Sequence, residues 1–353
     1  MSEAEVTKEG LRGVRPGREA TPGTAITPGT QDGRRRRGRV SRPRRRGEQP
    51  MVPPAEFASY YGKPILNAPV WRSPEIPGYL FLGGLAGGSS LLAAGAQLTG
   101  RPALARATKA GAAGAIGLGL AGLVADLGRP GRLVNMLRVF KPTSPMSVGS
   151  WLLAGYAPAA GAAAACAVTG HLPRAGTAAT AAAAMLAPGL ATYTAALITD
   201  TAVPAWHEGH LEMPFVFAGS AAMAAGGFGL LAAPLGESQP ARCLALFGVG
   251  TEAIAFERMT RRAGLVAEPY RSGRGGGYIR AGQALSVLGV AVALLGRRSR
   301  AISALSGASL LAASAATRWG IFHAGLDSAR DPKYTVVPQR DRLNGRAGGP
   351  PSP

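Results

Sequence analysis

The sequence has little of the residue types that bind redox metals. Its 353 residues include two cysteines, Cys166 and Cys243, and both lie within apolar segments. An iron–sulfur cluster needs four thiolates, and a membrane haem needs histidines that face each other from within the spans. The four histidines instead fall in expected loops or near expected helix ends: His171, His207, His210 and His323. The sequence therefore excludes haem and iron–sulfur ligation in this chain, and it contains no zinc-site spacing.

Acidic residues are also scarce: 19 Asp and Glu stand against 39 Lys and Arg, which gives a net charge of +20. Residues 1–50 hold 13 of the cations and 6 of the acids, including the run "RRRRGRVSRPRRRGE". This part has almost no large apolar residues and cannot bury a core, so residues 1–54 are predicted to be a disordered basic tail. Met51 is an alternative start. The other cations lie between and beside apolar segments, so the charge does not indicate a nucleic-acid-binding protein.

Long apolar runs are abundant, although alanine and glycine keep the mean hydropathy at +0.10. A helix needs about 20 residues to cross the hydrocarbon core of a membrane. The runs lack a polar face, which argues against a soluble alanine-rich protein. They predict an all-α integral membrane protein with eight transmembrane helices, at about 78–98, 107–127, 147–169, 175–199, 212–233, 241–258, 279–296 and 300–322. The transmembrane domain is expected to span residues 55–326, and residues 327–353 to form a C-terminal tail.

Two glycine-rich segments have structural interpretations. "GGLAGGSS" contains Gly83-xxx-Gly87 and Gly84-xxx-Gly88, a spacing that lets membrane helices approach closely. A phosphate-binding loop would need a preceding strand, which is not expected here. "SGRGGGY", at 272–278, is interpreted as a flexible loop between helices.

With eight spans, both termini lie on one side of the membrane, called side A here, and the opposite side is side B. Ionisable groups in or near the membrane are costly and therefore indicate function. Most of those in this chain fall at the side A ends of the predicted helices: Glu75, Tyr79, Asp126, Asp200, His207, Glu208, His210, Glu212, Glu257, Arg318 and His323. Trp206 lies beside His207 in the same predicted loop. Tyr193 is two helical turns before Asp200 on the same face. Glu252 lies deeper and is a candidate proton-conducting group.

The segment "DLGRPGRLVNMLRVFKPTSPMSVGSW", from Asp126 to Trp151, is too specific for a plain loop. Its middle, "GRLVNMLRVF", is expected to form a short amphipathic helix at the interface. Together with "PEIPGYLFLGGLAGGSS", "YTAALITDTAVPAWHE" and "DPKYTVVPQR", it resembles the NrfD-like family, the membrane subunits of polysulfide reductase and related complexes. The similarity runs from about Ala55 to Arg340.

The resemblance implies an eight-helix fold of two four-helix bundles in the plasma membrane of a prokaryote. It implies exchange of menaquinone or ubiquinone near one membrane face. It also implies two partners: a ferredoxin-like subunit with four iron–sulfur clusters and a molybdopterin oxidoreductase subunit. The lipid bilayer is the remaining partner, and the chain would not be catalytic alone.

The resemblance also suggests roles for individual residues. Tyr193 matches a tyrosine that hydrogen-bonds a quinone carbonyl, and Asp126 matches an acidic position that exchanges the proton. The family's polar residue at the start of the first span falls near Glu75, next to Tyr79. A histidine that some members carry inside that span is absent, so His207 or Glu208 is expected to substitute. The remaining expectations are a proton path and a docking surface: Glu252, Asp200 and Glu257 for the path, and Arg129, Arg132, Arg138, Lys141 and Trp206 for docking.

Two questions stay open at this level. Lys and Arg near the spans are more numerous on side A, which predicts a cytoplasmic side A, whereas the better-known complexes carry this face outside the cytoplasm. The function also has alternatives: a secondary transporter with a path through Asp126, Asp200 and Glu252, or a purely structural anchor without a quinone site.

Overall fold

The computed structural model describes residues 5–7, 10–12, 65–67, 69–128, 131–295 and 299–347. The chain divides into two compact units, residues 1–55 and residues 56–353. In the first unit, strands β1 (Glu5–Thr7) and β2 (Gly10–Arg12) pair in antiparallel register. The rest of the predicted basic tail lies outside the described residues.

The second unit, called the helical unit, is all-helical over its described residues. Each of the eight predicted spans coincides with one long helix: α1 (Glu75–Leu98), α2 (Pro102–Leu127), α4 (Pro145–Thr169), α5 (Pro173–Thr199), α7 (Met213–Ala232), α8 (Gln239–Ala263), α10 (Gly273–Leu295) and α11 (Arg300–Arg330). Short elements connect or follow them: α3 (Gly131–Met136), α6 (Pro204–His207), η1 (Leu235–Glu237), η2 (Gly264–Ala267), α9 (Glu268–Arg271) and α12 (Lys333–Ala347).

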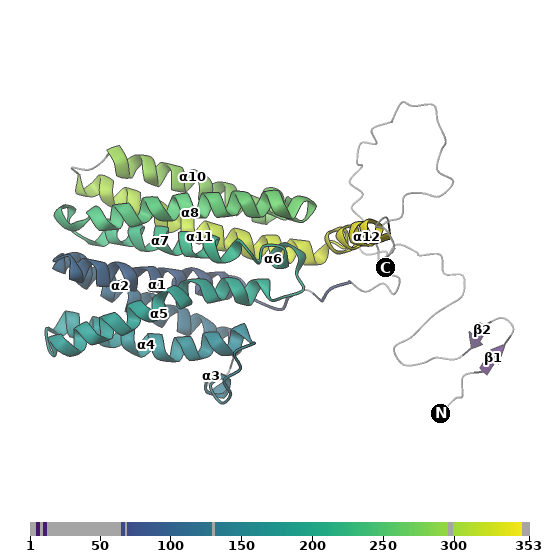
Figure 1. The fold of residues 1–353 in the computed structure, drawn as a ribbon, viewed down its shortest axis with the longest axis horizontal. Helices are drawn as coiled ribbons and strands as arrows, with labels where there is room; N and C mark the ends of the chain where they lie inside the picture. Colours follow the sequence, from purple (N-terminus) through teal and green to yellow (C-terminus); the bar gives the residue numbers. More distant parts are fainter. Residues whose placement is uncertain are drawn as a thin grey trace, which may run out of the picture. The chain divides into compact units, whose positions relative to one another are not determined.

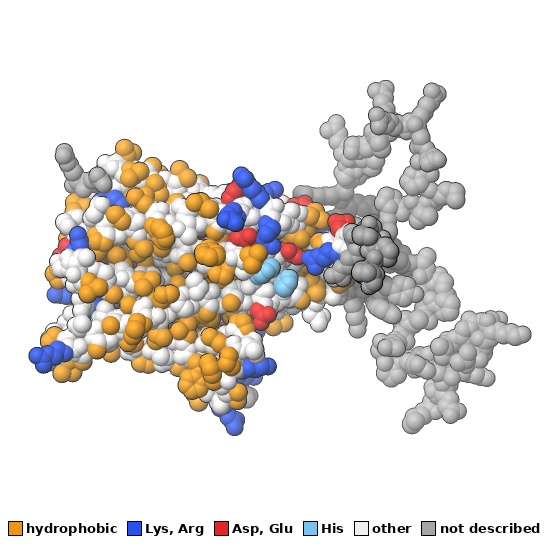
Figure 2. Space-filling view, in the orientation of Figure 1, with side chains coloured by type: hydrophobic (Ala, Val, Ile, Leu, Met, Phe, Trp, Pro, Cys, Tyr) orange, Lys and Arg blue, Asp and Glu red, His pale blue; other side chains and the backbone are white. Residues whose placement is uncertain are grey.

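Six of the eight long helices are long and apolar enough to cross a membrane: α1, α2, α4, α5, α7 and α10. Helix α8 falls short because its second half carries a run of charged residues ending in Arg261 and Arg262. Helix α11 is longer than a span requires and contains Arg318 and Asp327. The chain is therefore a multi-pass membrane protein. Figure 2 shows hydrophobic side chains over the middle of the helical unit and charged side chains towards its two ends.

The long helices pack as two groups of four (Figure 1). The first helix group contains α1, α2, α4 and α5, and the second contains α7, α8, α10 and α11. Helices α1 and α5 contact α7 across the boundary between the groups, and α1 also contacts α11. Since successive long helices run in opposite directions, the short elements α3, α6, α9 and α12 all lie at the side A end.

Proline and glycine set several of these helix boundaries. Pro102, Pro145 and Pro173 occupy the first turns of α2, α4 and α5, where a missing N–H costs nothing. Gly128 and Gly170 end α2 and α4 with φ of 71° and 72°, the left-handed conformation that a helix C-terminus commonly requires.

Three of the four glycines of the small-residue motif in α1 pack against neighbouring helices, namely Gly84, Gly87 and Gly88, whereas a Cβ at Gly83 would have no neighbour within 4 Å. A Cβ added at Gly87 would lie 2.9 Å from the carbonyl oxygen of Ala187 in α5. At Gly88 it would lie 2.5 Å from the carbonyl oxygen of Ala221 in α7. These two glycines therefore bring α1 into backbone contact with both helix groups.

Two boundaries differ from the prediction. The segment 272–278, expected to be a loop, is helical from Gly273, because Gly275 allows α10 to pack against the backbone of Ala324 in α11. The expected C-terminal tail at residue 327 begins inside α11, which continues to Arg330 and is followed by α12.

Candidate functional site

The main candidate site is a cavity of about 130 Å³ at the side A end of the first helix group. We call it the tyrosine cavity. It takes lining residues from all four helices of the group and from α3, and its walls are mostly apolar. Its polar lining residues include Tyr79, Asp126, Ser150 and Tyr193, and α3 contributes Met136. The structure thus brings together three of the residues predicted to bind quinone.

The hydroxyls of Tyr79 and Tyr193 form a hydrogen bond with each other across this cavity. Tyr79 is buried in α1, whereas Tyr193 in α5 is half-buried. Because one hydroxyl donates to the other, the second hydroxyl keeps a proton that it can donate elsewhere. The pair therefore supplies a fixed hydrogen-bond donor inside an apolar cavity.

Gly149 in α4 makes room for the ring of Tyr193. A Cβ at position 149 would lie 2.7 Å from Cδ2 of Tyr193 and closer still to Cε2. The sequence motif contains this glycine, but its contact with a tyrosine 44 positions later could not be read from local pattern. Position 149 thus controls where the Tyr193 hydroxyl stands.

Asp126 reaches the cavity from the last turn of α2 and is half-buried. A carboxylate at a helix C-terminus meets the negative end of the helix dipole, a cost of about 0.3–1 kcal/mol. Arg132 offsets part of this by donating from Nη1 to the carbonyl oxygen of Leu127 at 2.7 Å. Asp126 does not stabilise α2, so its position is better explained by a role of its carboxylate in the cavity.

Glu75 lies one turn before Tyr79 at the start of α1. It does not line the tyrosine cavity in this structure. Its Oε2 is nevertheless buried and has no hydrogen-bond partner among the described residues. Residues four apart lie on the same helix face, so Glu75 is an unsatisfied acceptor on the Tyr79 side of α1.

His207 lies at a different place. It belongs to α6, and its Nδ1 is 3.2 Å from the carbonyl oxygen of Thr199. It lines a second cavity, of about 160 Å³, together with Glu208, Tyr334 and Arg342. The structure does not bring His207 or Glu208 to the tyrosine cavity, because α6 packs against α11 and α12.

Trp206 corrects the expected docking surface. Its side chain is fully buried, stacks on Trp71 with ring centroids 5.5 Å apart, and donates from Nε1 to the carbonyl oxygen of Ile321 at 2.8 Å. Its ring packs against Gly325, where any side chain would clash. Trp206 therefore anchors α6 to α11 and offers no surface to a partner.

The other docking residues are exposed. Arg132, Arg138 and Lys141 lie on α3 and on the segment that follows it, where Figure 2 shows cations around an apolar patch. Arg129 lies outside the described residues. Ser147 ties this segment to α4: its Oγ accepts from the Lys141 amide at 2.9 Å and donates to the carbonyl oxygen of Val139 at 3.0 Å. The cations are therefore displayed on an anchored segment.

A second candidate site lies inside the second helix group. Thr317 Oγ1 donates to Glu252 Oε1 at 2.8 Å, and Arg318 donates from Nη2 to the carbonyl oxygen of Phe217 at 2.8 Å. Arg318 is fully buried, its guanidinium lies 3.6 Å from the centre of the Phe217 ring, and its charge interacts with that of Glu252. The hydroxyls of Ser220 and Ser314 share a hydrogen bond of 2.8 Å.

We call Ser220, Glu252, Ser314, Thr317 and Arg318 the buried polar cluster. Sequence reasoning found Glu252 and Arg318 but missed the three hydroxyls. The spacing of Ser314, Thr317 and Arg318 places them on one face of α11, which was the available signal. Glu252 Oε2 and Arg318 Nη1 are buried without a hydrogen-bond partner among the described residues, so this cluster has capacity for a further polar group.

The remaining residues of the expected proton path are elsewhere. Asp200 caps the C-terminus of α5 and is exposed. Glu257 is exposed on α8 and pairs with Arg261 at 2.6 Å. The structure therefore does not join either residue to Glu252.

Ion pairs hold the short elements at side A. Arg262 in α8 binds Glu212 at the start of α7, with Nη2 2.7 Å from Oε2, and this hydrogen bond lowers the pKa of Glu212. Lys333 in α12 lies 2.8 Å from Glu268 in α9. The Lys333 ammonium lowers the pKa of Glu268, and the hydrogen bond to Glu268 raises the pKa of Lys333 to about 12. These pairs attach α12 and α8 to their neighbours.

Residues 65–238 match the family described as "Polysulphide reductase, NrfD". The match begins just before α1 and ends just before α8, so it contains the first helix group with the tyrosine cavity, and α7. No curated protein matches the chain. In the residues that the structure describes, no three His, Cys, Asp or Glu side chains gather in a way that could hold a metal ion. Over residues 65–238 this chain is similar to the polysulphide reductase NrfD family, the family that its motifs resemble.

Proposed function

We propose that this chain is the quinone-interacting membrane subunit of an oxidoreductase complex, with eight transmembrane helices. It exchanges electrons between the membrane quinone pool and a four-cluster iron–sulfur subunit, which serves a molybdopterin catalytic subunit. One observation carries the proposal: Tyr79, Tyr193 and Asp126, distant in sequence, line a single apolar cavity. The family match supports the same reading.

The lining residues fit a quinone headgroup. A quinone ring is apolar on its faces and accepts hydrogen bonds at its two carbonyl oxygens. Leu123, Leu153 and Leu197 provide apolar walls, and the hydroxyl of the tyrosine pair that is not donating to its partner provides a donor. Ligand sites of this kind are typically apolar with a few placed polar groups.

The chemistry that menaquinone or ubiquinone supplies when bound is the transfer of two electrons together with two protons. The chain's own residues orient the headgroup and handle the protons. The tyrosine pair holds one carbonyl oxygen through the Tyr193 or Tyr79 hydroxyl. Asp126 accepts or delivers a proton at its carboxylate, and the apolar walls exclude bulk water. Proton transfer by a positioned side chain contributes about 10²–10⁴-fold to rate.

The proposal extends to partner docking and to protons. Arg132, Arg138 and Lys141 form the docking surface for the iron–sulfur subunit, beside the tyrosine cavity that Met136 of α3 also lines.

Glu252 is the proton-handling group of the second helix group, because it combines a buried carboxylate with hydroxyl neighbours. Such a path would open to water at side A, where Asp200 and Glu257 are exposed but make no contact with Glu252.

Kinetics of the assembled complex test the site. Asp126→Asn should lower quinone turnover by about 100-fold or more, and Tyr193→Phe by about tenfold, the loss of one hydrogen bond. Dye-linked activity at the catalytic subunit should stay at the level of the unaltered complex in both variants. Asp341→Asn and Tyr278→Phe are matched controls, since these side chains are exposed and outside the cavity.

The alternatives predict different results. A purely structural anchor would show unchanged quinone turnover in both variants and would purify without bound quinone. A transporter path through Asp126, Asp200 and Glu252 has less support, because these acids lie in separate parts of the fold. Transporter sites typically use broken helices near the membrane midplane, whereas α2, α5 and α8 are continuous.

A further inference from the structure

A third feature lies at the side B end of the first helix group, away from the sites above. A cavity of about 260 Å³ opens between the C-terminal ends of α1 and α4 and the N-terminal end of α2. We call it the side B cavity. Three of its lining residues are cations, Arg101, Arg106 and Lys109, and no Asp or Glu is among its described lining residues.

Lys109 brings its charge to the membrane boundary although its backbone lies deeper. It is seven residues into α2, about 10 Å along the helix. Its Nζ donates to Gln97 Oε1 at 2.5 Å, and Gln97 is the second-last residue of α1. Gln97 in turn donates to Thr177 Oγ1 at 3.0 Å. The ammonium therefore extends towards side B, as long cationic side chains near helix ends do.

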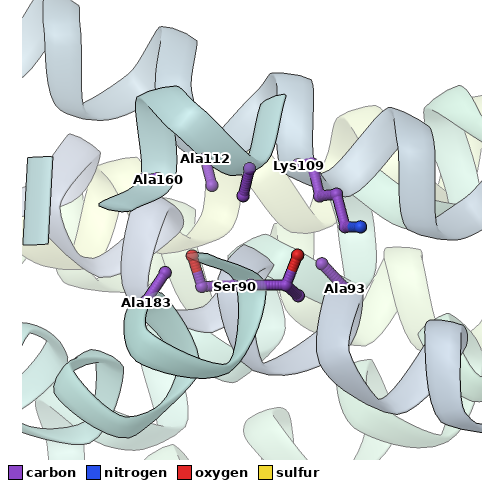
Figure 3. Close-up of a pocket in the computed structure, with 8 residues that line it drawn as sticks. Ser90, Ala93, Lys109, Ala112, Ala160 and Ala183 are labelled. Atoms are coloured by element: carbon purple, nitrogen blue, oxygen red, sulfur yellow. The ribbon is translucent and has the colours of Figure 1, made fainter. Parts of the chain in front are cut away.

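A smaller cavity lies on the inner side of Lys109 (Figure 3). Ser90, Lys109 and Thr180 line it, and its volume of about 10 Å³ is close to the roughly 10–15 Å³ that one water needs. Between the two cavities, Lys109 is half-buried and held by Gln97. The large outer cavity, in contrast, has room for a group far larger than water.

The charges around the side B cavity favour an anion. Arg106 is exposed and Arg101 half-buried, and they share the cavity with the Lys109 ammonium. The N-terminus of α2 adds the positive end of its helix dipole. Glu237, from the loop between α7 and α8, binds the amide of Leu104 at 2.8 Å but does not line the cavity. Cations on a loop can serve to fix the orientation of the chain in the membrane. That role does not explain why three cations surround one cavity.

We propose that the side B cavity binds the phosphate headgroup of an anionic phospholipid from the adjacent leaflet. A basic cavity between transmembrane helices at a membrane face is a known form of lipid headgroup site. Ala105 and Ala167, which also line it, give an apolar surface for the first methylene groups of the acyl chains. The phosphodiester oxygens accept from Arg101 and Arg106, and Lys109 closes the inner end. This site is independent of the quinone proposal.

Titration of the purified full chain tests the proposal. In neutral detergent, phosphatidylglycerol and phosphatidylcholine with matched acyl chains are added, and bound lipid is counted by native mass spectrometry. We expect preferential binding of phosphatidylglycerol. Arg101→Gln and Arg106→Gln should each weaken its affinity about fivefold, from the roughly 1 kcal/mol that one cation contributes near a membrane surface.

Arg174→Gln is the matched control, because Arg174 is an exposed cation on the same side that does not line the cavity. Its affinity for phosphatidylglycerol should equal that of the unaltered chain. Equal weakening in the control, or no weakening in the two cavity variants, would overturn the site. Inorganic phosphate at millimolar concentration is the last arm: if it competes fully with the lipid, the site binds free phosphate and the lipid assignment is wrong.

Discussion

The two helix groups are built from the same kinds of residue but use their polar side chains differently. In the first group, Tyr79, Tyr193 and Asp126 line a cavity and keep hydrogen-bonding capacity facing into it. In the second, Glu252 and Arg318 lie among packed helices and interact with neighbouring side chains and backbone. The first arrangement suits a ligand that enters and leaves, and the second suits charges that stay within the protein.

Two glycines, one in each group, make different kinds of contact. Gly149 faces the ring of a side chain, Tyr193, whereas Gly248 in α8 faces backbone: a Cβ there would lie 2.6 Å from the carbonyl oxygen of Gly219 in α7. A ring can move away from an added methyl group, but two helices can only separate. A methyl group added at Gly149 should therefore change the position of a functional group, whereas one added at Gly248 should change stability.

The largest expected effect is on the buried charges. Glu252→Leu should lower the free energy of unfolding by about 3 kcal/mol, because it leaves the Thr317 hydroxyl without its acceptor and removes the acidic neighbour of the buried Arg318. The measurement is thermal or denaturant unfolding of the purified chain in detergent. A second substitution, Arg318→Leu in the same chain, should restore part of the loss. An unfolding free energy equal to that of the unaltered protein would show that Glu252 does not compensate Arg318.

The glycine pair tests the difference between the groups directly. Gly248→Ala should cost about 1–3 kcal/mol of stability and leave quinone turnover per folded complex unchanged. Gly149→Ala should displace the Tyr193 ring and lower quinone turnover by about 10- to 100-fold, with a smaller loss of stability. Unfolding and turnover are measured on both variants, and the opposite pattern would remove the distinction between the groups.

Much of the fold could be predicted from the sequence because hydrophobic burial and helix length are local properties. Each apolar run became one helix, and prolines at 102, 145 and 173 mark helix starts that need no tertiary information. Of the motif glycines in α1 that were predicted to pack, Gly84, Gly87 and Gly88 do, and Gly83 does not. The same properties give a weaker prediction that α8 and α11 cross the membrane, because charged residues interrupt the apolar sequence of both helices.

The site could be predicted only where helix geometry carried the information. Tyr193 and Asp126 were placed on helix ends that must meet at side A, and they line one cavity. Trp206 and His207 were misplaced for a common reason: both belong to α6, a single turn whose direction depends on contacts with α11 and α12. The buried position of Trp206 depends on Gly325, more than 100 residues away, and no local pattern indicates such a contact.

A smaller effect is expected from pH at the side A ion pairs. The folded-state pKa values of Glu212 and Glu268 are lowered by Arg262 and Lys333, so these pairs stabilise the protein above the unfolded carboxylate pKa of about 4.3. That contribution disappears as the pH falls through the lower folded pKa values. The melting temperature of Glu212→Gln should therefore be below that of the unaltered chain at pH 7, and the difference should shrink as the pH falls below about 4.3. A difference that stays constant as the pH falls would contradict the electrostatic origin.

The smallest expected effect concerns Glu257, which belongs to α8 but not to the buried polar cluster. It forms an exposed i,i+4 pair with Arg261, and such pairs contribute less than about 0.5 kcal/mol. Glu257→Gln should therefore leave the unfolding free energy unchanged within that margin, unlike Glu252→Leu. Proton uptake coupled to quinone turnover, measured in vesicles, decides its remaining role. If Glu257 feeds a path to Glu252, both Glu257→Gln and Glu252→Gln lower uptake. If only Glu252→Gln lowers proton uptake, protons reach the second helix group without Glu257. The proton-handling role of the second group then belongs to its buried polar cluster and not to the exposed acid on α8.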